Sequence, residues 1–579
     1  MRKYVTRAAI AAGTVAGLLW VAAGTGTATG GQERQYVVLY TQGGSAAAAH
    51  AAIAAAGGTV LDENAAIGVA TVTTKSDAFP AAAAARGSSA IAGVARSTVI
   101  GHAPDDRLAD GKASFKRDAA QADLLGATAG RQASTGADKD KKKQEPLAGL
   151  QWDMQQIGAT ADGSQRYEQG KGVRVGIIDT GVDGSHPDIA ANFDKALSRN
   201  FTTDIPVDAN GTTVDGPCEH PSCVDPVDED DNGHGTHVAS EIASPVNKLG
   251  IAGVAPEATI VNLRAGQDAG FFFLQPTVDA LTYAGDHGID VVNMSFYVDP
   301  WLFNCTDNPA DSPEDRAEQA TVIQAMQRAL DYAYAHGVTL VAAAGNGATD
   351  YTKTIVDSSS PDFPSVPGEA PYTRTIPTSC ISMPSEGTHV LSVTSTGIST
   401  RKAYYSDYGN GYADLSAPGG DVYDTADQKR DITKAILAAY PKHLAEERGQ
   451  LNPDGTPNTP SVVQSCNKGV CGYYQYLQGT SMASPHAAGV AVLAVGRLGV
   501  KDHVNGGKKA SPAAVEQLLR GTATDHACPT PPLFTYTRQV LQSNGTYVTV
   551  TTNHLCEGTT TNNGFYGDGI VNAKKVAKG

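Results

Sequence analysis

Three residues of this chain are of the types that build a nucleophilic catalytic site. Asp179 follows an apolar run, His234 follows an acidic run that ends in glycine, and Ser481 follows Gly-Thr. A serine hydroxyl is a weak nucleophile until a base removes its proton. A histidine can act as that base, and a buried carboxylate fixes its tautomer and stabilises the imidazolium. The three residues are therefore candidates for acyl transfer through a covalent serine intermediate.

The sequence blocks around these residues are specific. Ser481 stands in Gly-Thr-Ser-Met-Ala-Ser-Pro-His, and His234 begins His-Gly-Thr-His-Val-Ala. The chain order Asp, His, Ser differs from the orders in chymotrypsin and the α/β-hydrolases. The blocks closely resemble the signature blocks of the subtilase family of serine proteases. The resemblance implies a secreted serine endopeptidase, made as a preproenzyme, that cleaves protein or peptide substrates.

A fourth block supplies a polar side chain next to an apolar run. Asn346 lies in Ala-Ala-Gly-Asn-Gly. An amide aimed at the developing oxyanion stabilises a tetrahedral intermediate, although Asn-Gly is also a frequent turn. The resemblance assigns Asn346 to the catalytic set. It also implies six substrate-binding residues, which are Ser295, Phe296, Tyr297, Ala343, Ala344 and Gly345.

One segment departs from the family pattern. Subtilases commonly carry Ser-x-Gly-Gly on the strand that walls the primary specificity pocket, and here Tyr297 and Val298 replace the two glycines. Bulk at this wall predicts a preference for small or medium residues before the cleaved bond. The alternative is that Tyr297 turns outward and leaves the pocket open.

The histidine block could alternatively bind a metal ion. His237 lies three residues after His234, whereas zincins place their histidines four apart with a glutamate after the first. The acidic run 228–233 begins like an EF-hand loop, but Ala239 stands where the required glutamate would be. The sequence therefore predicts no catalytic metal.

The resemblance nevertheless implies a structural calcium ion. The block 183–188 resembles a family segment whose final aspartate, here Asp188, is a calcium ligand. The loop 245–251 keeps the length of the family calcium loop and has Asn247 at the matching position. Calcium prefers several oxygen ligands, including backbone carbonyls. The alternative is that Asp188 and Asn247 only make turns.

The elements that must position these residues follow from apolar periodicity. From about residue 151 strands and helices alternate, which predicts a doubly wound, mostly parallel α/β sheet. The predicted strands cover 173–178, 259–263, 290–295, 338–344 and 390–395. The best predicted helix covers 313–336, with Ser312 as N-cap. Sites in such sheets lie at the carboxyl ends of the strands, and Asp179 follows one such end.

The peptidase domain is expected over residues 147–579, with an insertion at about 421–478. Subtilases carry a shorter connection at this place. The insertion is expected to contain a helix over 431–448 that is broken or kinked at Pro441. Surface decoration and a flap that contacts substrate are both compatible with this segment.

Three segments are predicted before the peptidase domain. Residues 1–28 have the basic start and short apolar run of a signal peptide, which predicts an extracellular protein. Residues 29–100 read as a small α+β domain that resembles the inhibitory propeptide of subtilases, with an ordinary accessory domain as the alternative. Residues 101–146 have the composition of a linker and are expected to hold the processing site.

Charge and cysteine content limit the function further. The formal net charge of −16 argues against nucleic acid as a partner, since nucleic-acid binding needs clustered positive charge. No later segment is long and apolar enough to suggest a stable membrane partner, and a monomer is expected.

The eight cysteines allow 105 pairings. We expect disulfides between sequence neighbours: Cys218–Cys223, Cys305–Cys380, Cys466–Cys471 and Cys528–Cys556.

Two other functions stay open at this point. An exopeptidase could use the same chemistry if the insertion at 421–478 blocked the cleft. An inactive subtilase-like scaffold could bind peptides without cleaving them, although all four catalytic positions are filled.

Overall fold

The computed structural model describes residues 34–76, 78–86, 89–96, 99–102, 144–296, 300–364 and 368–579. The predicted signal peptide, most of the predicted linker, Tyr297 and Val298 lie outside the described residues.

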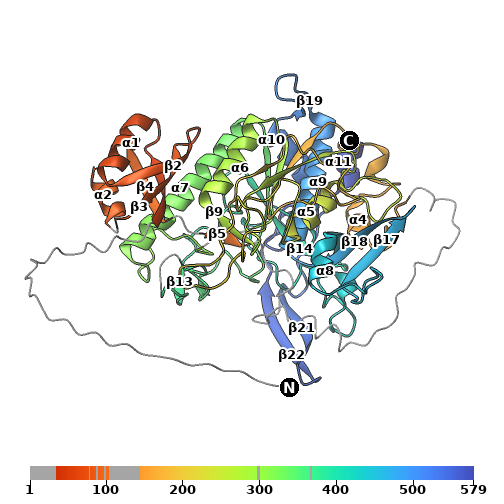
Figure 1. Ribbon diagram of the computed structural model, residues 1–579. Helices are drawn as coiled ribbons and strands as arrows, with labels where there is room; N and C mark the ends of the chain where they lie inside the picture. Colours follow the sequence, from red (N-terminus) through yellow and green to blue (C-terminus); the bar gives the residue numbers. More distant parts are fainter. Residues whose placement is uncertain are drawn as a thin grey trace, which may run out of the picture.

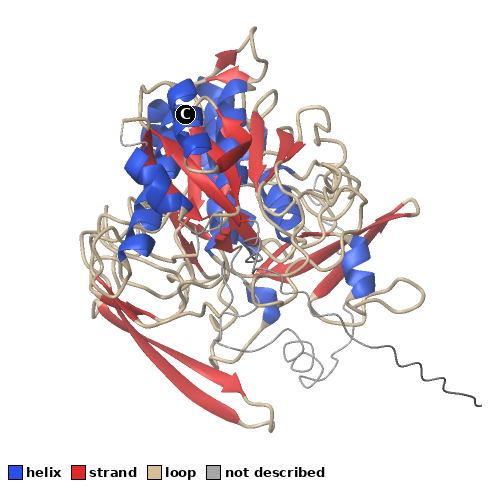
Figure 2. Ribbon diagram, turned by 60° about the vertical axis from the view of Figure 1, so that its left-hand side comes forward, coloured by secondary structure: helices blue, strands red, loops and turns tan. Residues whose placement is uncertain are grey.

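A seven-stranded parallel sheet forms the centre of the molecule, and helices cover both of its faces (Figure 2). Its strand order is β15-β14-β11-β10-β6-β8-β7. The strands are β6 (Arg174–Ile178), β7 (Arg199–Asn200), β8 (Thr259–Arg264), β10 (Val291–Met294), β11 (Thr339–Ala343), β14 (Val390–Thr396) and β15 (Leu415–Pro418). The five predicted strands are all present, which confirms the doubly wound α/β fold.

The helices divide between the two faces because successive side chains of a strand point to opposite sides. Val341 of β11 packs with α5 and α9, whereas Leu340 and Ala342 pack with α6 and α7. The helices of this domain are α4 (Trp152–Ile157), η2 (Ser164–Arg166), α5 (His234–Ala243), α6 (Leu274–Asp286), α7 (Pro313–Ala335), α9 (Thr480–Leu498), α10 (Pro512–Thr522) and α11 (Ala573–Lys578).

Helix α7 follows the sequence rules closely. The Ser312 hydroxyl accepts a hydrogen bond from the Asp315 N–H at 3.0 Å, and the Asp315 carboxylate accepts one from the Ser312 N–H. This capping box, with proline in the first turn, starts the helix where the sequence predicts.

Four small two-stranded sheets of the described residues lie outside the central sheet. They are β5 (Val99–His102) with β9 (Phe271–Phe273), β12 (Ile355–Asp357) with β13 (Arg374–Ile376), β19 (Val500–Lys501) with β20 (Lys508–Lys509), and β21 (Leu533–Leu541) with β22 (Tyr547–Leu555). The β21–β22 hairpin projects from the body of the molecule (Figure 1) and was not predicted from the sequence.

The N-terminal segment folds into a small antiparallel sheet with two helices. Its elements are β1 (Arg34–Tyr40), α1 (Ala46–Ala55), β2 (Gly58–Asn64), β3 (Val69–Thr74), α2 (Phe79–Arg86) and β4 (Ile91–Arg96), with strand order β2-β3-β1-β4. The predicted α+β character is confirmed, whereas β2 was missed. Strand β2 is polar and half exposed, so it lacks the apolar run that marks a strand.

This N-terminal unit packs against α6 and α7 (Figure 1). Val37 and Leu39 of β1 share a buried cluster with apolar residues of both helices. Arg96, at the end of β4, makes ion pairs with three carboxylates of the peptidase domain, those of Asp315, Glu318 and Glu369. The contact therefore combines apolar burial with a concentrated charge pairing.

The insertion forms a sheet and not the predicted long helix. Its elements are η3 (Ile432–Lys434), β16 (Ile436–Tyr440), α8 (Lys442–Glu447), β17 (Val462–Asn467) and β18 (Val470–Leu477), with strand order β16-β18-β17. The helix expected over 431–448 is wrong in its first part, because the apolar residues of β16 pair with β18 and are buried. Pro441 is the N-cap of α8 and does not kink a longer helix.

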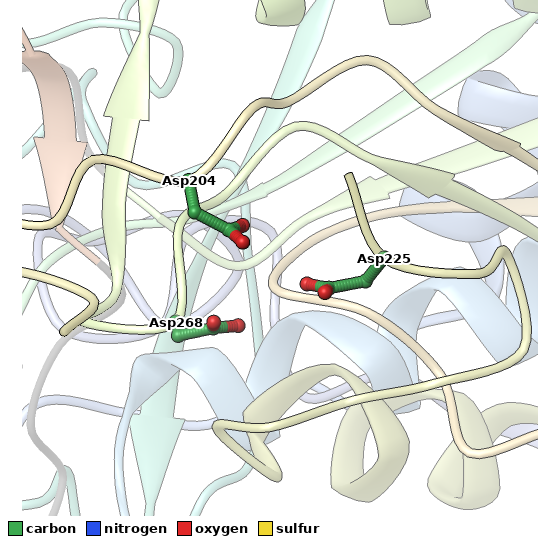
Figure 3. Close-up of side chains that lie close together, drawn as sticks. All are labelled: Asp204, Asp225 and Asp268. Carbon is green, nitrogen blue, oxygen red and sulfur yellow. The ribbon is translucent and has the colours of Figure 1, made fainter. Parts of the chain in front are cut away.

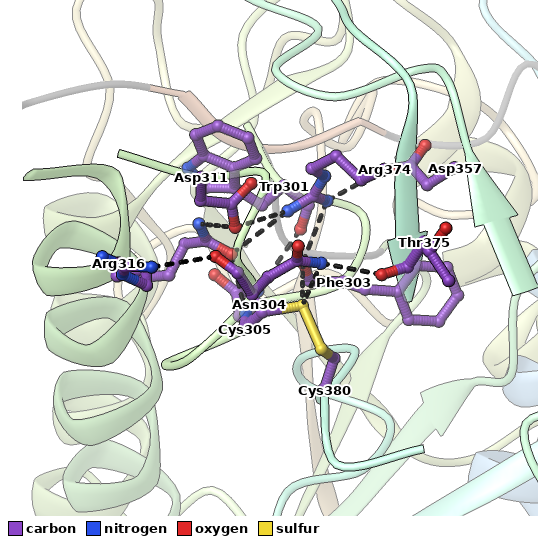
Figure 4. The surroundings of a disulfide bond; sticks show 12 residues. Trp301, Phe303, Asn304, Cys305, Asp311, Arg316, Asp357, Arg374, Thr375 and Cys380 are labelled. Carbon is purple, nitrogen blue, oxygen red and sulfur yellow. Dashed lines mark hydrogen bonds and ion pairs between the residues drawn. A yellow bond between two sulfur atoms is a disulfide. The ribbon is translucent and has the colours of Figure 1, made fainter. Parts of the chain in front are cut away.

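All four expected disulfides are present: Cys218–Cys223, Cys305–Cys380, Cys466–Cys471 and Cys528–Cys556. The Cys305–Cys380 bond lies in a dense polar setting (Figure 4). Beside it the fully buried Arg374 pairs with Asp311 and Asp357 and lies 4.6 Å from the ring centre of Trp301. The disulfide and the Arg374–Asp311 ion pair together connect the loop between β10 and α7 to the loop between β11 and β14.

Candidate active site

The sheet brings three predicted segments to one edge. Strand β10 lies between β6 and β11 in parallel register. Asp179 follows β6, Ser295 follows β10 and Gly345 follows β11, so all three lie at the carboxyl ends of neighbouring strands. The sheet thus gathers residues that are far apart in sequence.

Asp179 and His234 are in direct contact. The His234 Nδ1 lies 2.8 Å from Asp179 Oδ1, and both side chains are buried. His234 is the first residue of α5, and the next residue must be small, because a Cβ at Gly235 would collide with the carbonyl oxygen of Gly181. This close approach lets α5 begin beside the end of β6, where Asp179 can orient the imidazole.

A second buried carboxylate holds the histidine loop and was missed in the sequence. Asp230 accepts hydrogen bonds from the Gly233 N–H and from both the N–H and the hydroxyl of Thr236. Burial raises the pKa of Asp230 above its ordinary value. Its position inside an acidic run gave no signal that this one carboxylate turns inward.

Ser481 lies in the first turn of α9. Its hydroxyl donates to the carbonyl oxygen of Ser295 at 3.3 Å, and the Ser295 hydroxyl donates to the carbonyl oxygen of Ser481 at 2.9 Å. Helices α5 and α9 pack against one another, so His234 and Ser481 are carried by neighbouring elements. The helix start also offers backbone N–H groups and a favourable field for negative charge.

Asn346 is anchored through its side-chain oxygen. Asn346 Oδ1 accepts hydrogen bonds from the N–H and the hydroxyl of Thr480, each at 2.9 Å. The Thr480 hydroxyl also accepts a hydrogen bond from the Gly345 N–H at 3.1 Å. With the oxygen engaged in this way, Nδ2 is the atom of Asn346 that can donate to an oxyanion beside Ser481.

The expected substrate-binding residues that the structure describes, which exclude Tyr297, lie around this centre. The Phe296 ring stacks on Phe272 of β9, with 4.2 Å between ring centres. The Ala344 N–H donates to the carbonyl oxygen of Val393, and Ala343 ends β11. Strand β9 pairs in antiparallel fashion with β5 of the N-terminal region. An extended segment thus already lies along the strand that contacts Phe296.

A buried network of charged side chains joins α4, α5 and α9 and was also missed in the sequence. His486 Nε2 lies 3.0 Å from Asp153 Oδ2, and His486 Nδ1 lies 3.1 Å from Glu241 Oε2. Glu241 also contacts His237 Nδ1 at 2.8 Å, and His237 Nε2 donates to the carbonyl oxygen of Gln475. Both ring nitrogens of His237 therefore have protein partners.

This network predicts a loss of stability at alkaline pH. Burial alone would lower the pKa of His486, but its hydrogen bonds with Asp153 and Glu241 outweigh burial and raise the pKa to about 10. A raised pKa stabilises the fold below the unfolded-state value of about 6.5, and this stabilisation is lost as the pH rises towards 10. We expect the free energy of unfolding to fall between these pH values, by up to about 1.4 kcal/mol per pH unit.

Denaturant unfolding of a protein inactivated at Ser481 would measure this slope. The matched variant is His486→Gln, which should be less stable at pH 6.5 and should lack the same decrease between pH 6.5 and 10. An equal decrease in both proteins would exclude His486 as its source.

Asp188 and Asn247, the expected calcium ligands, lie next to each other. Asp188 Oδ1 accepts a hydrogen bond from Asn247 Nδ2 at 2.7 Å. Asp188 Oδ2 accepts one from the hydroxyl of Tyr474 at 2.7 Å and one from the Ile251 N–H at 3.0 Å. Both carboxylate oxygens are thus used by protein donors.

A different carboxylate cluster could bind a metal ion such as Ca²⁺. One oxygen from each of Asp204, Asp225 and Asp268 lies within 4.8 Å of the others (Figure 3). Neither oxygen of the buried Asp204 has a hydrogen-bond partner among the described residues. Arg264 pairs with Asp225 and Asp268. This single guanidinium balances only part of the negative charge of the three carboxylates. Burial and the charge of Asp225 raise the pKa of Asp204 to about 6.

No helix within the described part of the chain combines the length and the apolar character needed to span a membrane.

Comparison with known proteins gives a consistent result. Residues 170–559 match the family model described as the subtilase family. Subtilisin DY of Bacillus licheniformis is 26% identical over 330 residues, which cover 57% of this chain and 78% of that protein. Fervidolysin of Fervidobacterium pennivorans is 26% identical over 389 residues, but this chain spans only 41% of its length.

Among solved structures, the epidermin leader peptide processing serine protease of Staphylococcus aureus matches with a TM-score of 0.59. That alignment covers 94% of this chain and 98% of the other, at 19% sequence identity. At this identity the match supports the fold alone.

Proposed function

Because this chain belongs to the subtilase family of serine proteases, we propose that it is a secreted serine endopeptidase made as a zymogen. The observation that carries the proposal is the buried contact of 2.8 Å between Asp179 and His234, with Ser481 at the start of the neighbouring helix. Four disulfides support export to an oxidising compartment.

The proposed reaction follows from the atoms at the site. His234 Nε2 takes the proton of Ser481 as Oγ attacks the peptide carbonyl, while Asp179 stabilises the imidazolium through Nδ1. Asn346 Nδ2 and a backbone N–H at the start of α9 stabilise the oxyanion. His234 then gives its proton to the leaving amine, and water releases the acyl group by the same steps in reverse.

An end-blocked peptide would test endopeptidase activity. A long peptide acetylated at its N-terminus and amidated at its C-terminus should be cut at internal bonds, with products identified by mass spectrometry. Cleavage only of peptides with a free end would favour the exopeptidase alternative. Failure to react with an active-serine phosphonate, in the processed protein, would favour the inactive scaffold.

The N-terminal unit is proposed to be an inhibitory propeptide. Two contacts support this proposal: the packing of its sheet on α6 and α7, and the pairing of β5 with β9 beside Phe296. An extended segment that lies along β9 excludes a substrate from the same strand position. The segment 29–100 would then block the site until it is removed.

We predict maturation by cleavage between residues 101 and 150. Strand β5 ends at His102, so the chain leaves β9 within this window. N-terminal sequencing of the active secreted form would locate the cut, and the separated N-terminal fragment should inhibit the mature enzyme. A mature protein that starts near Thr29 would contradict this prediction.

We propose that the structural calcium ion binds at Asp204, Asp225 and Asp268. Chelation should then lower the melting temperature of the parent protein by a few degrees, because a ligand that binds only the folded state stabilises it. Asp204→Asn should abolish this effect, whereas the exposed Asp307→Asn should keep it. A melting temperature of the parent that does not respond to chelation would contradict the site.

A further inference from the structure

The place expected for calcium at Asp188 is filled by a tyrosine of the insertion. Tyr474 of β18 is fully buried, and its hydroxyl donates to Asp188 Oδ2. A Cβ at Gly250, in the loop expected to bind calcium, would collide with this hydroxyl. Gly250 also has a φ of +68°, a conformation that side chains rarely adopt. The loop is thus shaped around Tyr474.

The remaining donors also do not fit a cation. Asn247 Oδ1 accepts a hydrogen bond from the Leu249 N–H at 2.8 Å, so its NH₂ group faces Asp188. Calcium requires oxygen ligands at about 2.3–2.6 Å, and an N–H pointing at the carboxylate occupies that direction. The protein here satisfies Asp188 with hydrogen-bond donors in place of a metal ion.

Strand β18 also contacts the helix that carries the catalytic histidine. Three successive residues of the strand take part. The Tyr473 carbonyl oxygen accepts from His186, the Tyr474 hydroxyl donates to Asp188, and the Gln475 carbonyl oxygen accepts from His237 of α5. These contacts place the middle of β18 along α5 and along the segment 186–188.

The C-terminal end and the middle of α5 also contact this region. Ser244, at the C-terminal end of α5, donates its hydroxyl to the carbonyl oxygen of Asp188 at 2.9 Å. Within the helix, the Ser240 hydroxyl accepts from the N–H of Ala439 in β16 at 2.8 Å. Asp188 thus links Tyr474 to the end of α5.

Before α5, helix α8 of the insertion contacts the loop that leads into His234. His443 lies 3.0 Å from the Asp231 carboxylate, and Arg448 donates to the carbonyl oxygen of Asn232. A Cβ at Gly233 would lie 3.1 Å from Leu444. The insertion therefore contacts α5 before its start, along its length and, through Asp188, at its end.

We propose that the insertion sheet (β16, β17 and β18) holds the catalytic-histidine helix α5 in place without calcium, and that Tyr474 is the positioning residue that closes the loop 245–251. The expected role of Asp188 and Asn247 as calcium ligands is replaced by this tyrosine contact. Only the turnover experiment for this inference rests on the proposed function.

Hydrogen exchange tests the proposal independently of activity. In the full chain carrying Ser481→Ala and Asp204→Asn, which lacks the calcium site proposed above, calcium and chelator should give the same exchange rates over 245–251. Adding Tyr474→Phe should raise exchange in this loop and in α5 by at least about tenfold, the effect of losing one hydrogen bond to a charged group. The matched control is Tyr536→Phe, which removes a buried hydroxyl bonded to the Lys402 carbonyl oxygen elsewhere in the fold.

Turnover gives the second readout. In the active enzyme, Tyr474→Phe should lower kcat several-fold with KM unchanged, because β9 and β10 still bind substrate, and Tyr536→Phe should not. Calcium protection of 245–251 in the Asp204→Asn protein, or equal exchange in the two tyrosine variants, would overturn the proposal. Equal kcat values for the parent and for Tyr474→Phe would overturn the positioning role of Tyr474. If the parent itself shows no turnover, the proposed function fails. The exchange rates still test whether Tyr474 holds α5 and the loop 245–251 in place.

Discussion

Ser481→Ala should abolish peptide hydrolysis and leave the precursor uncleaved. The hydroxyl of Ser481 is the nucleophile in the proposed mechanism, and alanine leaves no atom that can form the acyl bond. Loss of the triad serine lowers kcat on the order of 10⁶-fold, a magnitude measured in subtilisin. Activity above the uncatalysed rate could survive, since the oxyanion site and substrate binding remain.

Purified parent and variant proteins would be compared on one peptide substrate and by the mass of the secreted form. Ser416→Ala is a suitable control, because Ser416 is a buried serine on β15 whose hydroxyl donates to the Thr394 carbonyl oxygen. This control should keep full activity and normal processing. Normal turnover by Ser481→Ala would refute the nucleophile assignment.

Asn346→Leu should lower kcat roughly 10²–10³-fold with little change in KM. This is the known effect of losing the same type of donor in subtilisin and not a value calculated from this structure. An interaction made only with the oxyanion affects kcat and kcat/KM equally. Steady-state kinetics on a single peptide would separate these parameters.

The anchoring of Asn346 by Thr480 calls for its own control. Thr480→Val removes the hydroxyl that donates to Asn346 Oδ1 but leaves the amide and the Thr480 N–H in place. The loss of kcat should then be no more than about tenfold, the worth of one hydrogen bond. A kcat for Asn346→Leu that also lies within tenfold of the parent would argue against the oxyanion role.

The sequence was most informative where function depends on short contiguous blocks. The blocks around Asp179, His234, Asn346 and Ser481 predict both the chemistry and the strand ends that carry it, because parallel strands align their carboxyl ends at one edge. The direct contact between Asp179 and His234 agrees with this expectation. The finer roles of the four residues stay predictions until activity is measured.

The insertion shows where such reasoning stops. The run Ile436–Tyr440 is apolar and short, and periodicity does not distinguish a buried strand from a helix at this length. Its hydrogen-bond partner, β18, comes more than 30 residues later and after a second strand. Pairing over that distance decided the structure, whereas local propensity favoured a helix.

Buried polar groups were equally invisible in the sequence. His486 meets Asp153 across 333 positions, and Tyr474 meets Asp188 across 286. Each residue alone looks like an ordinary polar or aromatic position. Only the folded chain shows that a tyrosine hydroxyl contacts Asp188, which was expected to bind calcium, or that Asp204, Asp225 and Asp268 converge.

The contact between the N-terminal unit and α7 has a consequence for how activation would depend on dilution. While the chain is intact, Arg96 and its three carboxylate partners belong to one molecule, so their contact does not depend on the protein concentration. Cleavage of the linker turns the same contact into a bimolecular equilibrium. If the N-terminal unit is the proposed inhibitor, it would then stay bound at high protein concentration and dissociate by mass action when the protein is diluted.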